Sequence, residues 1–246
     1  MVPSLVSNKG LLFAGLCHDI HIEKIPYIDF HTHSRWNGDD VLEVVSMHGA
    51  QDKDVIYYTV GYHPWWTLKL LNENELALMS HLYGNDTFCL GMGELGLDNL
   101  KGADIELQEK ICIQQIQIAN ISKSPVVIHC VRAFDRMLRL RKKYGETPWV
   151  VHGFVRNKTL AGQVLEAGMY ISVAPHDHIS LSFEETLFYL PLDKIFLETD
   201  SDITMDIKER YRIFAAMRGI DIQVLKDQMY QNFITFYTEK WKHHIG

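Results

Sequence analysis

Cysteine is scarce in this sequence, and its cysteines form no recognisable motif. The four that occur among 246 residues are Cys17, Cys89, Cys112 and Cys130, and no two of them are spaced as CxxC. Each lies in an apolar stretch, as buried thiols that stay reduced commonly do. The sequence therefore argues against a disulfide framework and favours a reducing compartment, so we expect a cytoplasmic protein.

Long apolar runs are also absent. No stretch approaches the roughly 18 residues that a membrane-spanning helix needs. Residues 11–17 (LLFAGLC) follow Lys9 as in a signal peptide, but the run is short and lacks a small-x-small cleavage site. We therefore expect no membrane partner. We expect residues 1–24 to form an N-terminal extension, as an extra strand or hairpin, before a single domain over 25–246.

Positive charge is in deficit, with 24 basic residues against 31 acidic ones and a formal net charge of −7. No global field would attract a polyanion, so any nucleic acid must be bound through local contacts. We find no internal repeat, low-complexity tract or linker. The sequence does have 47% hydrophobic residues, which is enough to bury a substantial core in one domain.

Short apolar runs alternate with helical patterns, which is typical of parallel strands joined by crossover helices. Eight strands in about 250 residues match a TIM barrel, a (β/α)8 fold of the α/β class, whose chemistry lies at the C-terminal ends of the strands. The predicted strands are 27–30, 41–47, 55–60, 88–93, 125–129, 149–152, 169–173 and 195–198. The predicted helices are 72–83, 104–122, 132–144, 158–167, 183–189, 205–218 and 222–242.

The first three predicted strands follow one another too closely for ordinary crossover helices. We therefore expect the first βα units to be short or irregular, and that side of the barrel to be stripped of helices.

The first predicted strand ends in three polar side chains, Asp29, His31 and His33. Because side chains alternate along a strand, His31 and His33 point the same way and can bind one metal ion together. Asp29 lies on the same face one step earlier, where it could accept a ring N–H and fix the tautomer of a ligand histidine. An HxH pair alone is not specific, because two such histidines are common by chance.

The same feature recurs in later strands, where the apolar run stops at a residue that can bind metal or move protons. For any one of these residues alone, a hydrogen-bonded histidine or a solvated carboxylate is the simpler explanation. Core filling does not explain six of them in register on one rim. The six are His31, His33, Glu94, His129, His152 and Asp200.

Four imidazoles and two carboxylates are too many ligands for one tetrahedral ion, but they suit two divalent ions that share a carboxylate. Glu94, in GMGELGLD, is the natural bridge, since the glycines let the backbone pass close to the ions. Asp200, in IFLETDSD, is placed to bind an ion and to accept the proton of the attacking water. The sequence leaves the metal open among Mg²⁺, Mn²⁺ and Zn²⁺.

In their order along the chain, these residues resemble the TatD family of metal-dependent hydrolases, from about Tyr27 to Phe236. GExGLD and ETD in this order are specific, whereas GYHP or HxH alone would not be. The matching segments are 29–33 (DFHTH), 61–64 (GYHP), 93–98 (GELGLD), 108–119 leading to 127–129 (VIH), 151–154 (VHGF), 168–172 (GMYIS), 198–200 (ETD) and Asn232.

The resemblance implies a TIM barrel that hydrolyses phosphodiester bonds in DNA, as an exonuclease that trims single-stranded ends from the 3′ side. It implies catalytic roles for Glu94 and Asp200. It also places His63 beside the site, where the matching residue serves substrate phosphate or proton transfer. The metal ligands that it implies are His31, His33, Glu94, His129, His152 and Asp200.

Three departures from the family pattern concern the substrate side. Members often carry an arginine two residues after the histidine of the fifth strand, where this sequence has Val131 and then Arg132. A proline usually follows ETDx, but here that position is Asp202, which adds negative charge to the loop. The stretch between His33 and Gly61 is short, which predicts a more open groove on that side.

Candidate substrate contacts lie on the same rim. Arg132 is the first choice for a phosphate contact, because its helix begins at the catalytic rim, whereas the other cations of that helix suit a solvated face. Trp65 and Trp66 follow GYHP and could stack on a base, although packing against neighbouring loops explains them equally well. His176 and His178 also face the site, where a third metal or a substrate contact competes with a hydrogen-bonded loop.

Two other functions stay open. An amidohydrolase acting on an amide, lactone or small ester has a similar barrel and HxH start, but such enzymes often bridge their metals with a modified lysine, where this sequence offers Glu94. A metal-binding barrel without turnover, serving as an interaction module, would have lost a ligand or Asp200, and none is lost. The leading prediction is a two-metal phosphodiesterase, a deoxyribonuclease of the 3′–5′ exonuclease type.

Overall fold

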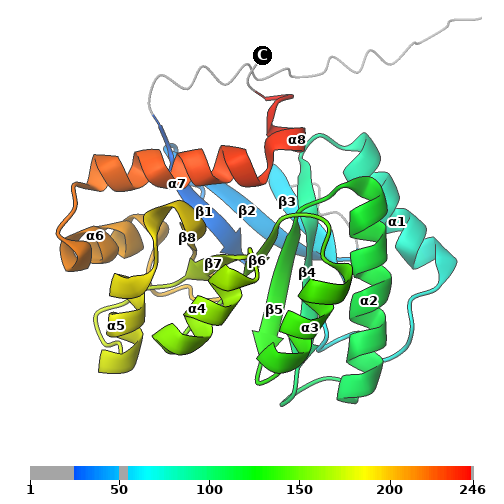
Figure 1. The fold of residues 1–246 in the computed structure, drawn as a ribbon. Helices are drawn as coiled ribbons and strands as arrows, with labels where there is room; N and C mark the ends of the chain where they lie inside the picture. The colour runs from blue at the N-terminus through cyan, green and yellow to red at the C-terminus, as the bar shows by residue number, and fades with distance from the viewer. Residues whose placement is uncertain (1–24, 50–54, 245–246) are drawn as a thin grey trace, which may run out of the picture.

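The computed structural model describes residues 25–49 and 55–244, and eight parallel strands lie in it side by side in their order along the chain. An isolated bridge between Thr32 and Asp200 joins the segment after the last strand to the first strand. The predicted (β/α)8 barrel is therefore confirmed (Figure 1). The strands are β1 (Tyr27–Thr32), β2 (Val41–His48), β3 (Tyr57–Gly61), β4 (Cys89–Asp98), β5 (Val126–Val131), β6 (Trp149–Val151), β7 (Tyr170–Val173) and β8 (Ile195–Leu197).

Helices follow the strands from β3 onward, and most of them begin at a capping side chain. Asn72, for example, accepts the N–H groups of Asn74 and Glu75 and completes a capping box with Glu75. In the described part of the chain, no helix has the length and apolar character needed to cross a membrane. The helices are α1 (Glu73–Asn85), α2 (Ile105–Ser122), α3 (Phe134–Tyr144), α4 (Lys158–Glu166), α5 (Leu181–Tyr189), α6 (Ile207–Arg218), α7 (Ile222–Phe236) and α8 (Thr238–Trp241), with a 3-10 turn, η1 (Leu192–Lys194), before β8.

In the first part of the barrel, the described residues form strands without crossover helices. No helix lies between β1 and β2, nor in the described residues that connect β2 to β3. The prediction that short connections strip this side of helices is therefore confirmed for the described residues. The extension predicted for residues 1–24 lies outside them.

An aromatic layer closes the end of the barrel at which the strands begin, where α7 lies across it (Figure 1). Phe30 of β1 stacks on Phe196 of β8, with ring centroids 3.8 Å apart. Phe236 and Tyr237, at the end of α7, pack against Phe30 at 5.5 and 5.6 Å. Burial of these large rings fixes one end of the barrel and leaves the other end for chemistry.

The last helix is interrupted where the sequence predicts continuity. Instead of one helix over 222–242, α7 and α8 are separated by Tyr237, which has φ −99° and ψ 22°. After this break, Trp241 packs against Tyr57 and Phe233, with ring centroids 5.4 and 4.9 Å apart. The single-helix prediction is wrong because tertiary packing overrides the helical periodicity.

Strand β4 continues past its predicted end at residue 93 and carries Glu94 inside the strand. It runs to Asp98, and all of its residues are buried. Gly96 permits this course, because its φ is 154° and a Cβ there would lie 1.9 Å from the carbonyl oxygen of His129 on β5. Only glycine allows the two backbones to approach so closely. Glu94 is therefore held by the sheet and not by a loop.

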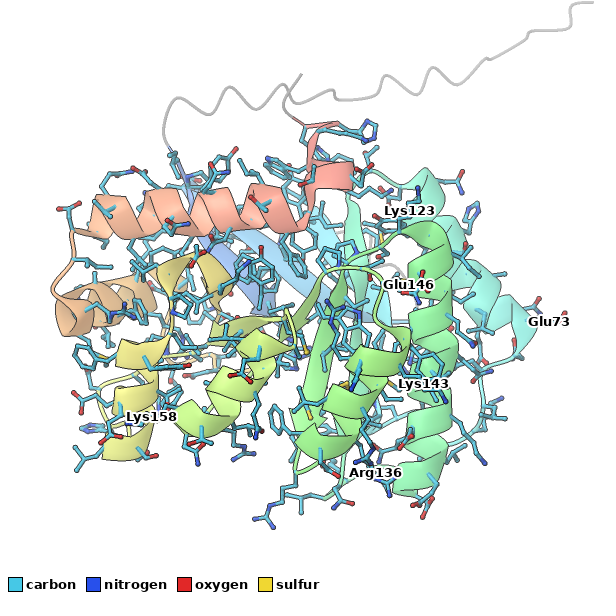
Figure 2. The ribbon with its side chains drawn as sticks, in the orientation of Figure 1. Glu73, Lys123, Arg136, Lys143, Glu146 and Lys158 are labelled. Carbon is cyan, nitrogen blue, oxygen red and sulfur yellow. The ribbon has the colours of Figure 1, made fainter. Side chains whose placement is uncertain are left out.

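Five basic residues of α3 form a cluster toward the outer surface of the molecule, where Figure 2 shows Arg136 and Lys143; the other three are Arg139, Arg141 and Lys142. Arg136 donates to Glu109 and Glu106 of α2 at 2.9 and 3.0 Å. These contacts fit a solvated helix face that pairs with its neighbour, as expected for most of this cluster.

Candidate metal centre

The six predicted ligands lie at or near the C-terminal ends of strands, on the rim opposite the aromatic layer. Their positions are within β1 (His31), directly after β1 (His33), within β4 (Glu94), within β5 (His129), directly after β6 (His152) and three residues after β8 (Asp200). Within the described residues, three groups of side chains bring their ligand atoms within 4.8 Å of one another. The groups are His31 with His33 and Asp200, His31 with Glu94 and His152, and His63 with Glu94 and His129.

The two imidazoles from β1 face two carboxylates at distances that suit a shared ion. His31 Nε2 and His33 Nε2 lie 3.4 and 3.2 Å from Glu94 Oε2. Asp200 Oδ1 lies 3.4 Å from His33 Nε2 and 4.0 Å from His31 Nε2. Bonds of about 2.0–2.2 Å to a tetrahedral ion separate neighbouring ligand atoms by about 3.3–3.6 Å. Three of the four separations are therefore close to those of a coordination shell.

A second set of imidazoles surrounds the other oxygen of Glu94. Oε1 lies 2.7 Å from His152 Nε2, 2.9 Å from His129 Nδ1 and 2.9 Å from His63 Nε2. Glu94 thus faces the β1 histidines with one oxygen and this second set with the other. That is the arrangement a carboxylate needs to serve two neighbouring ions.

Burial and the neighbouring imidazoles shift the pKa of Glu94 in opposite directions. Burial would raise its pKa, but the neighbouring imidazoles, with His152 the strongest, outweigh burial and hold the pKa well below its usual value. Against the cost of its own burial, His152 has its pKa raised to about 10, because Glu94 attracts its charged form. Burial, with His152 nearby, lowers the pKa of His31 to about 4. Glu94 is therefore ionised, and His31 is in the neutral form that binds metals.

Asp200 closes the barrel through its backbone and presents its side chain to the site. Its N–H donates to the carbonyl of His31, and its own carbonyl accepts the N–H of His33, both at 2.9 Å. Its φ of 54° lies in the left-handed region, which Asp adopts more readily than most residues. The side chain is 34% exposed. A rigid backbone with an accessible carboxylate suits a proton acceptor.

Asp98, at the end of β4, orients His129, a role that the sequence analysis does not predict. Its Oδ2 accepts from His129 Nε2 at 3.0 Å and from Trp65 Nε1 at 2.6 Å. Burial would raise the pKa of Asp98, but these two donors lower it below its usual value. The ionised carboxylate only accepts, so Nε2 of His129 carries the proton and Nδ1 turns a lone pair toward Glu94. Asp98 is the last residue of the GExGLD motif, so the motif itself pointed to this residue.

Glu198, in the ETD motif, is a second residue whose role was not predicted. Its Oε1 accepts the N–H of Gly153, next to His152, at 2.6 Å. Burial raises its pKa to about 7, although His152 attracts the charged form. Glu198 therefore fixes the backbone that carries a predicted ligand. A glutamate directly after a buried strand is itself buried and needs hydrogen-bond donors. Its position in the sequence was therefore the one available sign of this role.

The structure gives Asp29 a different partner from the one expected. Its carboxylate accepts the backbone N–H and the hydroxyl of Thr199 at 2.9 and 2.6 Å. Burial raises its pKa to about 8, even though these bonds favour the charged form. Asp29 thereby ties β1 to the segment after β8, which is a different role from the one expected for it.

His63, directly beyond β3 and Tyr62, presents an N–H to the centre. Its Nδ1 accepts the backbone N–H of Trp65 at 3.1 Å. Burial lowers its pKa despite the attraction of Glu94, so the ring is neutral with its proton on Nε2. This N–H donates to Glu94 Oε1 at 2.9 Å. The geometry suits the expected contact with phosphate, or proton transfer, better than metal ligation.

Two predicted substrate contacts lie in different surroundings. Arg132 is exposed directly after β5, with φ 49°, and α3 begins two residues beyond it. Trp65 is held by its bond to Asp98 and by Lys101 Nζ, 3.6 Å from the ring centroid. Trp65 therefore fits the packing explanation, whereas Trp66 is 54% exposed.

His176 and His178 form the hydrogen-bonded loop that was the alternative to a third metal. The N–H of His178 donates to His176 Nδ1 at 3.3 Å. In the described residues, neither of them belongs to a group that could hold an ion.

Asp202, which stands where the family usually has a proline, is paired with a buried arginine. Arg210 of α6, which is only 1% exposed, donates to Asp202 Oδ2 at 2.6 Å and to the carbonyl of Pro175 at 3.1 Å. The extra negative charge is thereby paired, and the loop after Asp200 is anchored to α6.

The polar atoms of the centre fit divalent cations. Glu94 Oε2 and His31 Nε2 are buried and have no hydrogen-bond partner among the described residues. Leaving such atoms unsatisfied is costly. The lone pair of His129 Nδ1 also faces a Glu94 oxygen at 2.9 Å, and two acceptors so close together favour a cation beside them. Imidazole and carboxylate ligands suit Zn²⁺ or Mn²⁺, and carboxylates also suit Mg²⁺.

Comparison with known families and curated proteins places this geometry among metal-dependent hydrolases. Residues 39–238 match the family described as TatD related DNase. The chain is 23% identical over 205 residues to "Uncharacterized metal-dependent hydrolase YcfH" of Escherichia coli (strain K12), which covers 76% of this chain and 75% of that protein. It is 29% identical over 159 residues to "3'-5' ssDNA/RNA exonuclease TatD" of Pectobacterium atrosepticum, which covers 60% of this chain and 58% of that protein.

Solved structures share the fold. YJJV, a TatD homolog from Escherichia coli K12, superposes with a TM-score of 0.68 at 20% identity, over 80% of this chain and 86% of that chain. A TatD family hydrolase from Entamoeba histolytica gives 0.65 at 17% identity, over 86% and 98% of the two chains. An uncharacterized amidohydrolase from Saccharomyces cerevisiae gives 0.65 at 13% identity, over 87% and 100%. At these identities the likeness concerns the barrel.

Proposed function

The chain belongs to the TatD family of metal-dependent hydrolases, and from that premise we propose that it is a nuclease that removes nucleotides from the 3′ end of a single strand. The observation that carries this proposal is the position of Glu94. One of its oxygens faces the histidines of β1 and the other faces those of β3, β5 and β6, which supports a two-ion site for phosphodiester hydrolysis.

The chain would hold two divalent ions through His31, His33, Glu94, His129, His152 and Asp200. When bound, such ions lower the pKa of water and offset the charge that grows on the phosphoryl oxygens. Asp200, accessible and rigidly held, accepts the proton of the attacking water. His63 donates its Nε2 proton to a phosphoryl oxygen or to the leaving group. Arg132, exposed on the same rim, binds a flanking phosphate.

The substrate class draws on one relative and on the charge of the chain. The Pectobacterium protein is named an ssDNA/RNA exonuclease, which supports a single strand of either kind. Because the net charge is −7, binding must depend on contacts at the rim and not on a broad positive surface. Hydrolysis of an amide or lactone has less support, since the buried lysines of the described residues, Lys226 and Lys240, lie on α7 and α8, away from the site.

The test is hydrolysis of 5′-labelled single-stranded DNA and RNA by protein stripped of metal and then supplied with Mg²⁺, Mn²⁺ or Zn²⁺. We expect Glu94→Gln and Asp200→Asn each to lower kcat/KM by at least about 10³-fold, with an unchanged circular dichroism spectrum. Glu146→Gln removes one carboxylate charge from the exposed surface (Figure 2) and serves as the matched control. Full turnover by both site variants would contradict the mechanism. Cleavage of an amide panel, without cleavage of any nucleic acid, would overturn the proposed function.

A further inference from the structure

A small cavity lies beside the metal centre, on the side of β2 and β3, where the described residues form no helix. Its volume is about 160 Å³. His33, His63 and Glu94 line it toward the centre, and His48 and Trp66 line it on the outer side. Pockets that enclose drug-sized ligands measure about 300–1,000 Å³. This cavity therefore has room for a single ring next to the reacting group, and not for a whole nucleotide.

His48, at the end of β2, brings a hydrogen-bond donor to the wall of this cavity. Its Nδ1 accepts the backbone N–H of His63 at 3.1 Å, so the neutral ring carries its proton on Nε2. Among the described residues, none accepts a hydrogen bond from that Nε2. Within the described part of the chain, this N–H is therefore available to a ligand. The sequence analysis assigns His48 no role, because nothing near it in the chain has a matching pattern.

Trp66 brings a flat apolar surface to the same cavity. Its ring is held by three neighbours, with centroid distances of 5.1 Å to His48, 4.7 Å to His63 and 6.2 Å to Trp65. The residue is nevertheless 54% exposed. A large aromatic side chain that is fixed in position and open to solvent next to a reaction centre is a stacking platform.

We propose that this cavity binds the base of the nucleotide next to the scissile phosphodiester, a subsite that rests on the proposed nuclease function. Trp66 stacks on the base, and His48 Nε2–H donates to a ring carbonyl. The size of the cavity suits a one-ring pyrimidine, and every pyrimidine base carries a carbonyl at C2. Since the metal centre lies at the inner wall, a base held in the cavity places its phosphate against Glu94 and His63.

Oligothymidylate and two abasic versions of it test this subsite. The abasic versions carry a tetrahydrofuran residue at the last or at the penultimate position of the 3′ end. Because stacking on an aromatic side chain is worth about tenfold or more in binding, we expect Trp66→Ala to raise KM for oligothymidylate about tenfold with little change in kcat. On the abasic version that lacks the bound base, the KM of the wild-type protein is already raised, and the substitution adds less than twofold.

Three further variants separate stacking and hydrogen bonding from the packing of the loop. Trp66→Phe keeps an aromatic face and restores most of the affinity. His48→Asn keeps an acceptor for the N–H of His63 but is too short to place a donor at the position of Nε2, and it raises KM about fivefold. Leu68→Ala, on the same loop at a residue that is 66% exposed and does not line the cavity, leaves KM unchanged.

Equilibrium binding of thymidine 5′-monophosphate, followed by calorimetry on the full chain, separates this inference from the proposed function. If nucleic acid is hydrolysed but Trp66→Ala changes neither KM nor nucleotide affinity, the subsite is overturned while the nuclease stands. If no nucleic acid is cleaved but the nucleotide binds and Trp66→Ala weakens it about tenfold, the base site stands and the reaction is another one. Absence of both cleavage and binding overturns both.

Discussion

His129 lies between two carboxylates that act on its two ring nitrogens in different ways. Asp98 accepts from Nε2 at 3.0 Å, and Glu94 lies 2.9 Å from Nδ1. Because Asp98 is ionised and also bound by Trp65, it fixes the proton on Nε2. A residue that touches no ion in the proposed centre thereby decides whether His129 can offer a lone pair.

Replacing Asp98 by asparagine tests this control. The amide places N–H groups where the carboxylate accepts, so His129 moves its proton to Nδ1 and loses the lone pair that faces the centre. We expect the affinity for Mn²⁺ or Zn²⁺ to fall by about 10–100-fold, measured in competition with a chromogenic chelator. Asp104→Asn is the control, since asparagine caps the first turn of α2 as well as aspartate does. Equal affinities in both variants would contradict the argument.

The raised pKa of Asp29 predicts how the free energy of unfolding depends on pH. Its pKa is about 8 in the folded chain against an ordinary value of 3.8, so its ionisation opposes folding. The penalty begins as the pH rises above 3.8 and is complete once the pH exceeds about 8. Asp29→Asn keeps an acceptor for the N–H of Thr199 without the charge. The gap in unfolding free energy between this variant and the wild-type protein should therefore widen from pH 4 to pH 8 in urea titrations, and a constant gap would refute burial of the Asp29 carboxylate as the cause.

For individual residues, the sequence predicted which side chains lie together at the C-terminal rim of the barrel. Each strand has one C-terminal end, and the barrel brings all of these ends together. It could not predict which side chains bind to those residues. Asp98 binds His129 on the neighbouring strand, Glu198 binds Gly153, next to His152, from two strands away, and Thr199 binds Asp29 across the closure of the barrel. Such pairings depend on register, which no spacing along the chain records.

Among the elements, α7 does more than cover the barrel, because Asn232 fastens it to the start of β8. Its Nδ2 donates to the carbonyls of Leu192 and Ile195 at 2.7 and 2.8 Å, and the residue is only 3% exposed. The segment that leads to Asp200 is thus anchored to the helix that closes the opposite end. The resemblance to the family included Asn232, and the structure supplies a physical reason for it.

Removing that anchor leaves buried carbonyls without their donor. We expect Asn232→Ala to lower the unfolding free energy by about 1–3 kcal/mol, measured by urea denaturation. Thr235→Ala, on the same helix, removes only a hydroxyl that bonds to the carbonyl of Gln231 in its own helix. The unfolding free energy of Thr235→Ala should stay within about 0.5 kcal/mol of the wild-type value. An equal loss in both variants would contradict a specific stabilising role of the bonds that Asn232 makes to Leu192 and Ile195.

Most elements were predictable because apolar periodicity and turn residues agree along this chain. The exceptions have physical causes. β4 extends to Asp98 because Gly96 allows close approach to β5, whereas a glycine in a strand usually predicts an interruption. The helix expected over 222–242 breaks at Tyr237, where the aromatic core sets the direction of the chain. The lack of helices among the described residues around β2 was predictable from spacing alone, but the cavity between His48 and Trp66 was not.

In the whole molecule, one end of the barrel stabilises the fold and the other end carries the candidate metal centre. Aromatic rings from β1, β8 and α7 fill one end, while the other end concentrates imidazoles and carboxylates with several buried atoms left unsatisfied. Such a centre destabilises the fold by itself, because desolvated polar atoms without partners oppose folding. Cations that bind there would therefore stabilise the entire barrel.

This coupling gives a prediction that needs no substrate. A ligand of the folded state alone, at 100 times its Kd, adds about 2.7 kcal/mol, and for a chain of this length each kcal/mol raises Tm by about 2–4 °C. We expect saturating Mn²⁺ or Zn²⁺ to raise Tm by about 5–10 °C in differential scanning calorimetry, and a chelator to reverse the rise. Glu94→Gln should lose the whole rise, since both sets of imidazoles depend on this carboxylate. Asp200→Asn should keep part of it, because only the group with His31 and His33 includes Asp200, and equal losses in the two variants would contradict a carboxylate shared between two ions.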